Sequence, residues 1–320
     1  MEIKYLSPEE KERSRALYED CFPEDTERFV DYYYKEKCKD NQILVLEDQE
    51  EICSMIHLNP FTISMYGNLA QVCYIVAVAT REDCRRNGYM LQLMERAFYD
   101  RYRAGDPFTF LIPANPDYYY SCGFDFWENQ RELKQDQDTI WNENRTVAAA
   151  KPVDCEEMAG YSNRVLAKRF DLFIQKDEAY YERLIREQES EDGHVVILRD
   201  AHKPYEICGL FSFDRECGVE IREPVMEDCC TETVHPIMMG RVLNLERFCG
   251  MIKCNEKIRR NLEIRDELIP ENNGTFCITI DENGGQAVRI HGLQVEESLD
   301  IAEFGKQMFH DMRIYINEVV

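Results

Sequence analysis

The sequence lacks the patterns that mark membrane, secreted and metal-binding proteins. None of its windows approaches the ~20 uninterrupted apolar residues of a membrane span, and the charged start MEIKYLSPEEKERS has no apolar core of a secretory signal. The 14 cysteines include no C-x-x-C pair and the six histidines are scattered, so no zinc finger or ribbon can be assembled. We therefore expect a cytoplasmic protein without a membrane span or bound metal, with reduced cysteines packed as small hydrophobes.

Positive charge is also scarce. The chain has 38 Lys and Arg against 62 Asp and Glu, a formal net charge of −24. A field of this sign repels nucleic acid and anionic membranes and concentrates cations, so we expect no nucleic-acid partner. A cationic acceptor such as a polyamine or an amino sugar would suit it. The alternative is that the acidity only keeps a bacterial protein in solution.

Length and hydrophobic periodicity predict two or three domains of α/β or α+β class. The first domain begins with a helix at Ser7, where Ser7 and Glu10 form a capping box, and a second helix follows. A helix pair, an antiparallel meander and one strand–loop–helix–strand unit then complete this domain. The expected helices are 7 onward, 25–37 and 89–103, with Gly105 as the stop, and the expected strands are 42–47, 52–58, 61–65, 70–80 and 108–112.

The rest of the chain divides into two further units. A polar stretch at 131–153 is expected to include a linker, and the second unit is expected at 151–234. A third unit, 235–320, contains the turn residues Asn272-Asn273-Gly274 between predicted strands. The expected helices are 154–169, 176–189 and 298–309; the expected strands are 195–198, 207–213, 276–280 and 287–290; 239–248 is read as a strand or a helix start.

The most informative stretch is Val76–Met94, in which a buried strand enters a loop rich in arginine that opens into a helix. Backbone N–H groups at a helix start have no internal partners, and together with the helix dipole they form an anion site. Gly88 allows a close approach of the backbone, and Arg85 and Arg86 add full charge. A pyrophosphate fits this chemistry. The alternative is a surface loop whose arginines bind nothing.

Other phosphate-binding motifs do not fit this stretch. No Lys-Ser or Lys-Thr follows the glycine, as a nucleotide P-loop requires, and no G-x-G-x-x-G is present for a dinucleotide fold.

The segment Arg85-Arg86-Asn87-Gly88-Tyr89-Met90 resembles the coenzyme A motif R/Q-x-x-G-x-G/A of the GNAT acetyltransferases. The resemblance implies that backbone amides of this loop bind the pyrophosphate of acetyl-CoA, and that the preceding strand pairs with pantetheine. Met90 departs from the motif, where Gly or Ala is usual, and we expect a modified fit. The implied acetyl-CoA residues are Val76, Ala77, Val78, Ala79, Arg85, Arg86, Asn87, Gly88, Tyr89 and Met90.

A second resemblance lies at Tyr119-Tyr120-Ser121-Cys122-Gly123-Phe124, which is similar to the Y-x-x-x-G-F/Y that follows the next strand in many GNAT enzymes. It implies that Tyr119 lies beside the thioester sulfur and protonates the leaving thiolate. Tyr118 and Tyr120 are interpreted as aromatic packing residues. Packing is also the alternative for Tyr119.

The whole chain resembles the Eis (enhanced intracellular survival) type of GNAT acetyltransferase, through Arg169-Phe170-Asp171, Ile221-Arg222-Glu223, Met238–Leu245 and the end Tyr315–Val320. This implies a catalytic GNAT domain at 1–150, a GNAT-like domain at 151–234 that is shortened between about 222 and 235 and lacks a coenzyme A site, and a sterol-carrier-protein-like domain at 235–320. It also suggests a ring-like homo-oligomer.

In Eis-type enzymes the terminal carboxylate reaches the active site and acts as base towards the acceptor amine, which assigns this role to Val320 by resemblance. Tyr315 and Ile316 offer apolar anchors for such a tail, and Asn317 and Glu318 offer polar ones. The alternative is an ordered or frayed chain end without a role in catalysis.

The predicted function is acetyl-CoA-dependent N-acetyl transfer to a primary amine of a small molecule or peptide. One rival is a covalent acyl-cysteine mechanism, but no cysteine has a local histidine partner. A second is a non-catalytic acyl-CoA or lipid-binding protein, and a third is a structural partner in an assembly. The intact Arg85–Gly88 loop favours the enzyme, and the sequence does not identify the acceptor.

Overall fold

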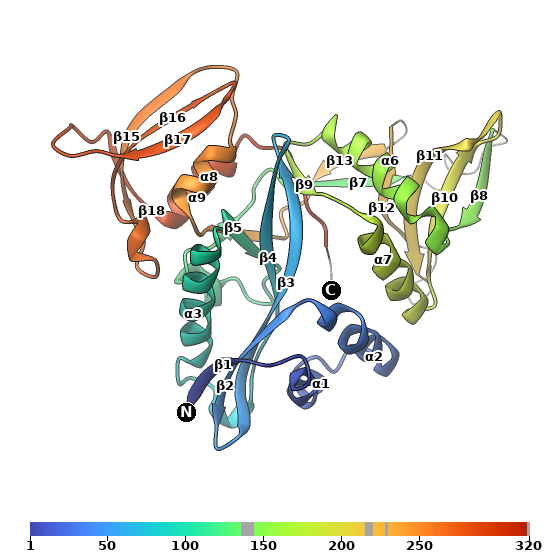
Figure 1. Ribbon diagram of the computed structural model, residues 1–320, viewed down its shortest axis with the longest axis horizontal. Coiled ribbons are helices and arrows are strands. Elements are labelled where there is room, and N and C mark those ends of the chain that lie inside the picture. Colours follow the sequence, from blue (N-terminus) through green and yellow to red (C-terminus); the bar gives the residue numbers. More distant parts are fainter. Residues whose placement is uncertain (136–143, 215–219, 228–229, 319–320) are drawn as a thin grey trace.

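The structure is a computed structural model, and it describes every residue except 136–143, 215–219, 228–229 and 319–320. Two smaller units flank one large mixed sheet (Figure 1). Over the described residues this sheet has nine strands, in the order β1-β2-β3-β4-β5-β14-β6, with β9 on β3 and β19 on β9. Their bounds are β1 Glu2–Tyr5, β2 Gln42–Asp48, β3 Glu51–Met65, β4 Asn68–Thr80, β5 Phe108–Leu111, β6 Asp125–Phe126, β9 Leu172–Ile174, β14 Met239–Val242 and β19 Ile314–Tyr315.

Helices cover both faces of the large sheet, because the buried apolar side chains of β2 point alternately to one face and to the other. Ile43 and Val45 pack with the helices that precede the strand, whereas Leu44 and Leu46 pack with the long helix after β4. Successive strand residues point to opposite faces, so an apolar run of this kind needs cover on both. The helices are η1 Lys11–Ser14, α1 Arg15–Cys21, α2 Glu27–Lys35, η2 Lys37–Lys39, η3 Glu82–Cys84, α3 Tyr89–Ala104 and α4 Asp117–Tyr120.

The middle unit is a four-stranded antiparallel sheet, in the order β12-β11-β10-β8, with two helices against it. A separate antiparallel pair is formed by β7, which precedes this sheet in the chain, and β13, which follows it. The bounds are β7 Arg131–Gln135, β8 Arg145–Ala149, η4 Pro152–Asp154, α6 Cys155–Ala167, α7 Glu178–Ser190, β10 His194–Asp200, β11 Lys203–Asp214, β12 Glu220–Met226 and β13 Cys230–Val234.

The C-terminal unit is a second four-stranded sheet, in the order β17-β16-β15-β18, packed on two helices. Its last strand pair, β15 with β18, is parallel. The bounds are α8 Leu245–Met251, β15 Ile258–Arg265, η5 Pro270–Asn272, β16 Gly274–Asp281, β17 Gly284–Arg289, β18 Glu297–Asp300 and α9 Ile301–Phe309.

The polar stretch 131–153, expected to include a linker, contains β7, β8 and η4, and four of the predicted elements differ from the observed ones. The capping box of Ser7 holds in part, because the Ser7 N–H donates to Glu10 at 3.1 Å, but the helix begins only with the 3₁₀ turn at Lys11. The strands expected at 52–58 and 61–65 are one continuous strand, β3. The segments 239–248 and 298–309 each contain a short strand followed by a helix.

The strand β14 lies in the first sheet, between β5 and β6, although sequence analysis assigns it to the unit that starts at 235. The chain thus returns to the first sheet after the middle unit. No helix in the described part of the chain is long and apolar enough to cross a bilayer.

Candidate functional site

The parallel strands β4 and β5 separate soon after they meet. Their only pairs are Cys73 with Thr109 and Tyr74 with Phe110, within the described residues. The Thr109 hydroxyl donates to the Cys73 carbonyl at 2.7 Å and closes this end of the ladder. Beyond Tyr74, the edge of β4 that faces β5 carries backbone groups without a strand partner there. Such an edge can pair with an extended ligand.

A β-bulge lies on this open stretch. Val76 pairs with His57 and Ala79 pairs with Met55, so β4 holds one more residue than β3 over this interval. Ala77 at the bulge has φ +48°, a left-handed conformation that costs a non-glycine residue about 1 kcal/mol or more. A bulge redirects backbone groups and is often found beside active sites. The four predicted pantetheine-binding residues, Val76–Ala79, are therefore the bulge and its neighbours.

The loop after β4 presents unpaired backbone donors to solvent. Gly88 is the N-cap of α3, its φ is +73°, and no side chain caps this helix start. The first intrahelical bond runs from Gln92 N to the Gly88 carbonyl, which leaves the N–H groups of Tyr89, Met90 and Leu91 at the open end. A Cβ added at Gly88 would meet no atom within 4 Å, so the space beside this backbone is open.

The charges at this helix start are positive and uncompensated. Arg85 and Arg86 are exposed and form no ion pair with any residue that the structure describes, whereas the nearby Arg81 is paired with Glu51 and Asp83. Among the residues that the structure describes, the Arg85 guanidinium donates only to the Thr80 carbonyl, at 3.2 Å. In a chain of net charge −24, two free guanidinium groups beside a helix N-terminus indicate an anion site.

Tyr119 lies in α4, after the C-terminal end of β5, and is the buried member of the tyrosine triplet. Its exposed fraction is 6%, against 60% for Tyr118 and 47% for Tyr120. Its ring meets Phe124 edge-on at 6.1 Å and shares a core with Leu111, the last residue of β5. Burial raises the pKa of Tyr119 to about 12, so the phenol keeps its proton at neutral pH.

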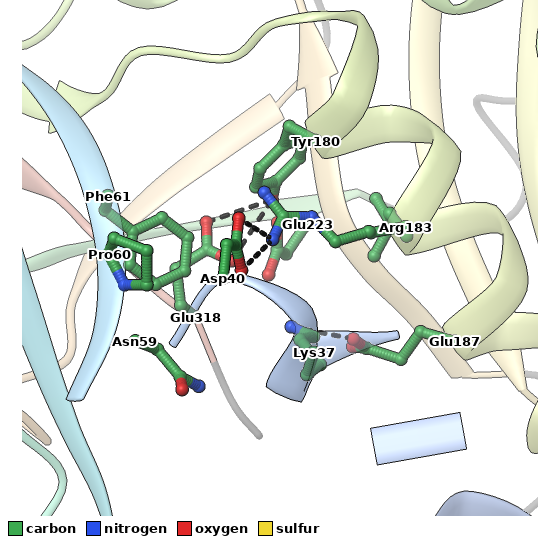
Figure 2. Close-up of a pocket in the computed structure, with 11 residues that line it drawn as sticks. Lys37, Asp40, Asn59, Pro60, Phe61, Tyr180, Arg183, Glu187, Glu223 and Glu318 are labelled. Carbon is green, nitrogen blue, oxygen red and sulfur yellow. Dashed lines mark hydrogen bonds and ion pairs between the residues drawn. The ribbon is translucent and has the colours of Figure 1, made fainter. Parts of the chain in front are cut away.

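A small cavity of about 40 Å³ lies between β3, the turn after α2, and the middle unit (Figure 2). By volume it would hold about three ordered water molecules. It lies near the point where β4 and β5 separate, because Asn59 on β3 pairs with Tyr74. Its lining residues are Lys37, Asp40, Asn59, Pro60, Phe61, Tyr180, Arg183, Leu184, Glu187, Glu223 and Glu318.

Two of the four carboxylates that line this cavity have their own cation. Asp40 accepts two bonds from Arg183, at 2.8 and 2.9 Å, and Glu187 pairs with Lys37 at 2.8 Å. These pairs join the N-terminal helices to α7.

The other two carboxylates, Glu223 and Glu318, share one cation. The buried Lys176 ammonium lies 3.8 Å from Glu223 and 3.5 Å from Glu318. Tyr180 accepts from Lys176 at 2.6 Å and donates to Glu318 at 2.9 Å. Burial and the neighbouring Glu318 raise the pKa of Glu223 to about 8. The cavity therefore has one carboxylate more than it has cations, and a proton or a cationic ligand would balance it.

Glutamine at position 223 is expected to stabilise the protein at pH 8 and to have little effect at pH 5. Between its ordinary pKa of 4.5 and the raised value, Glu223 binds a proton in the folded chain that it lacks in the unfolded chain. The free energy of unfolding therefore falls as pH rises through this window, and Glu223→Gln removes that fall. Melting temperatures from pH 5 to 8 would test this. Equal pH slopes for Glu223→Gln and the unmodified chain would contradict the expectation.

The chain end runs into the same region (Figure 1). Tyr315 and Ile316 are 3% and 1% exposed, and Gln130 donates to the Ile316 carbonyl at 2.7 Å. Asn317 donates to the Arg131 carbonyl at 3.0 Å. The four residues expected to anchor the tail, Tyr315–Glu318, are thus all held. The predicted base, Val320, lies outside the described residues.

The β4 edge, the arginine loop and Tyr119 are candidates from the sequence and stay predictions, whereas most residues of the acidic cavity were not predicted. Only Glu318 among the cavity residues was named as an anchor, and Glu223 appeared only as part of a family resemblance. Lys176, Tyr180 and Glu187 have the spacing of an ordinary amphipathic helix and its start, and no local signal marks them. In the described residues, no group of three or more His, Cys, Asp or Glu side chains is arranged to hold a metal.

Two family models match parts of the chain. The model of the acetyltransferase (GNAT) domain matches residues 2–127, and that of the sterol carrier protein domain matches residues 242–315. No curated protein matches the sequence significantly.

Several solved structures share the fold over almost the whole chain. A protein of unknown function from Enterococcus faecalis, described as "Probable N-Acyltransferase", has a TM-score of 0.79 and 15% identity over 95% of this chain and 88% of its own. A GCN5-related N-acetyltransferase from Anabaena variabilis has a TM-score of 0.77 and 15% identity, and the match covers 96% of this chain and 90% of its own. Eis1 from Mycobacterium abscessus has a TM-score of 0.72 and 12% identity, and the match covers 97% of this chain and 90% of its own. At these identities the likeness establishes the fold.

Proposed function

We propose that this chain, which contains a GNAT acetyltransferase domain and a sterol carrier protein domain, is an acetyl-CoA-dependent N-acetyltransferase of a primary amine. The observation that carries the proposal is the separation of β4 and β5. The edge of β4 that this separation leaves open begins close to the acidic cavity and ends at the arginine loop. Catalysis would belong to residues 1–150, with the middle unit shaping the acceptor side.

Acetyl-CoA would lie along the open edge of β4. Its pyrophosphate would bind the N–H groups at the start of α3, with Arg85 and Arg86 supplying charge. Its pantetheine would pair with Val76–Ala79. From Tyr74 to Thr80 the strand covers about 20 Å at 3.3 Å per residue, a length suited to an extended pantetheine arm. Met90 is partly exposed and adds a side chain where the family motif has Gly or Ala.

The acceptor amine would enter through the acidic cavity. The unbalanced carboxylate of the Glu223–Glu318 pair favours an ammonium group over a neutral one, and the volume of about 40 Å³ admits only a narrow aliphatic amine arm. The net charge of −24 would attract such cations over longer distances.

Transfer requires one group that takes a proton from the amine and one that gives a proton to the leaving sulfur. The amine nitrogen attacks the thioester carbonyl carbon directly, the carbon–sulfur bond breaks, and no acyl-enzyme is needed. Tyr119 would donate to the thiolate from its buried phenol, which is protonated at neutral pH. The α-carboxylate of Val320 would accept the amine proton. Among the described residues the alternative base is Glu318, which lines the cavity.

Tyr119→Phe is expected to lower kcat roughly 100-fold, the scale of a lost general acid, with little change in the KM of acetyl-CoA. Tyr118→Phe and Tyr120→Phe, whose hydroxyls are exposed, should keep kcat within about twofold by the same reasoning. Steady-state kinetics of the three variants would test the assignment. An unchanged kcat in Tyr119→Phe together with a lowered kcat in Tyr120→Phe would assign the role of proton donor to Tyr120 instead.

The proposed function itself is tested by calorimetry with acetyl-CoA, followed by an assay of thiol release with di- and polyamines. Binding accompanied by amine-dependent thiol release supports an enzyme. Binding of acetyl-CoA without release across the amine panel would favour the non-catalytic acyl-CoA-binding alternative.

A further inference from the structure

A buried arginine of β14 lies beneath the turn that carries Tyr119. The Arg241 side chain is fully buried, and it pairs with the equally buried Asp266 at 2.8 Å. Arg241 belongs to the first sheet, where it pairs with Thr109 of β5. Asp266 follows β15 of the C-terminal unit. This ion pair therefore connects the C-terminal unit to the sheet that holds the proposed active site.

Asp266 is rigidly held by its own unit. One carboxylate oxygen accepts from the backbone N–H groups of Leu268 and Ile269, at 3.0 and 3.1 Å. The other accepts from the Asn272 side chain at 2.9 Å. With Arg241 the carboxylate has four donors, which compensate for its burial. It can thus fix the arginine in place.

The guanidinium of Arg241 is less well satisfied. Its Nε and Nη1 atoms are buried and have no hydrogen-bond partner among the described residues. Its carbon lies 4.7 Å from the centroid of the Phe98 ring, which gives a cation–π contact. A buried charge with orphaned donors is costly, and an apolar side chain could fill the space at less cost. The placement therefore calls for another explanation.

The Nη1 atom occupies the space where the turn would carry a side chain. A Cβ on Gly123 would lie 2.4 Å from Nη1, and Gly123 has φ +79°. Two independent reasons thus require glycine at this position: its positive φ, and the arginine atom that fills the space of a side chain. With this geometry the Tyr119 carbonyl accepts from both Cys122 N, at 2.9 Å, and Phe124 N, at 3.3 Å.

A second line of contacts connects the same residues through aromatic rings. Phe98, under the guanidinium, packs against Phe124 at 5.8 Å, and Phe124 packs edge-on against Tyr119 at 6.1 Å. Arg241 therefore contacts the Tyr119 turn in two ways, directly at the backbone of Gly123 and indirectly through the rings of Phe98 and Phe124.

We propose that Arg241, fixed by Asp266, is a positioning residue for Tyr119, so that the C-terminal unit sets the geometry of proton donation in the first domain. This role presupposes the acetyl transfer proposed above. Arg241 itself touches no reacting atom. It holds the turn so that the phenol stays buried against Phe124.

The first test is Arg241→Met, which removes the charge and keeps an unbranched side chain. We expect kcat to fall roughly 10- to 100-fold, the scale of a small misplacement of a catalytic group, while the KM of acetyl-CoA stays within about twofold. The alkaline limb of the pH–kcat profile should move to lower pH, because a loosened turn admits water and lowers the pKa of Tyr119. Arg241→Lys should recover part of kcat.

The second test separates positioning from stability. Arg241→Met leaves Asp266 uncompensated and destabilises the fold, so the double variant Arg241→Met/Asp266→Asn removes both charges and keeps an oxygen for the two backbone donors. We expect it to regain melting temperature without regaining kcat. The control is Arg101→Met, which breaks a different ion pair, with the buried Asp106 at the C-terminal end of α3, and should leave the pH profile unchanged.

Recovery of both melting temperature and kcat in the double variant would overturn the positioning role and leave a purely structural ion pair. So would full kcat in Arg241→Met. If Arg241→Met does not fold, the double variant and Gly123→Ala decide the question, and Gly123→Ala is expected to lower kcat in the same way. An unmodified chain with no amine-dependent activity would instead refute the proposed function, independently of Arg241.

Discussion

Gly88→Val is expected to weaken acetyl-CoA binding by at least roughly 100-fold in calorimetry, while the protein remains folded. Valine disfavours the φ of +73° that this residue adopts at the start of α3, so the backbone must rotate and the N–H groups of the first turn change direction. Two lost charge-assisted hydrogen bonds of ~1.5–3 kcal/mol each would account for a loss of this size.

The side chain adds a second effect. The space beside Gly88 is open, so valine meets no protein atom there. It would instead project into the volume that the pyrophosphate needs. A loss of affinity is thus expected from the backbone and from the side chain together, with little change in packing.

Gly67→Val is the matched control. Gly67 lies in the turn between β3 and β4, its φ is +80°, and a Cβ there also meets no atom within 4 Å. Both substitutions should cost about 1–2 kcal/mol of stability through left-handed strain, and their melting temperatures should fall by similar amounts. Only Gly88→Val should lose acetyl-CoA. Unchanged affinity in Gly88→Val, or equal losses in both variants, would remove the pyrophosphate from this loop.

The part of the site that sequence predicts is the part encoded by neighbouring residues. The continuous apolar run of β4, the arginines after it and the helical period from Tyr89 lie within about thirty residues, and each leaves a local pattern. The bulge at Ala77 leaves none, because alanine is an ordinary strand residue and its positive φ arises from pairing with β3.

The acidic cavity could not be predicted because its residues come from five distant segments. Lys37, Asn59, Tyr180, Glu223 and Glu318 meet only after the middle unit has packed on the first sheet and the chain end has returned to that sheet. Each alone resembles a surface residue of an acidic protein. The same holds for Arg241, which looks like one charge between apolar strand residues until β14 is placed in the first sheet.

Extending the chain beyond Val320, or deleting Val319 and Val320, is expected to abolish acetyl transfer and leave acetyl-CoA binding nearly unchanged. The reason is the proposed role of the Val320 α-carboxylate as base. An α-carboxyl has a pKa of ~3.3–3.7, so it is ionised at neutral pH and can accept the amine proton. Extension converts this carboxylate into a neutral amide, and deletion moves the chain end back by two residues.

Folding should survive both changes because the anchors of the tail precede them. Tyr315 stacks on Phe170 at 4.9 Å, and the Gln130 side chain binds both Ile316 and Asn317. Melting temperature and acetyl-CoA affinity, measured beside kcat, would confirm that only transfer is lost. A chain with the same two residues replaced by alanine keeps a terminal carboxylate at position 320 and is the control.

Glu318→Gln separates the two candidate bases. Glu318 is 8% exposed, accepts from Tyr180 and pairs with Lys176, so its loss should weaken acceptor binding and raise the KM of the amine. If the Val320 carboxylate is the base, kcat at saturating amine should largely persist in Glu318→Gln and vanish in the extended chain. Full kcat in the extended chain together with an inactive Glu318→Gln would transfer the role of base to Glu318, whose carboxylate lines the cavity.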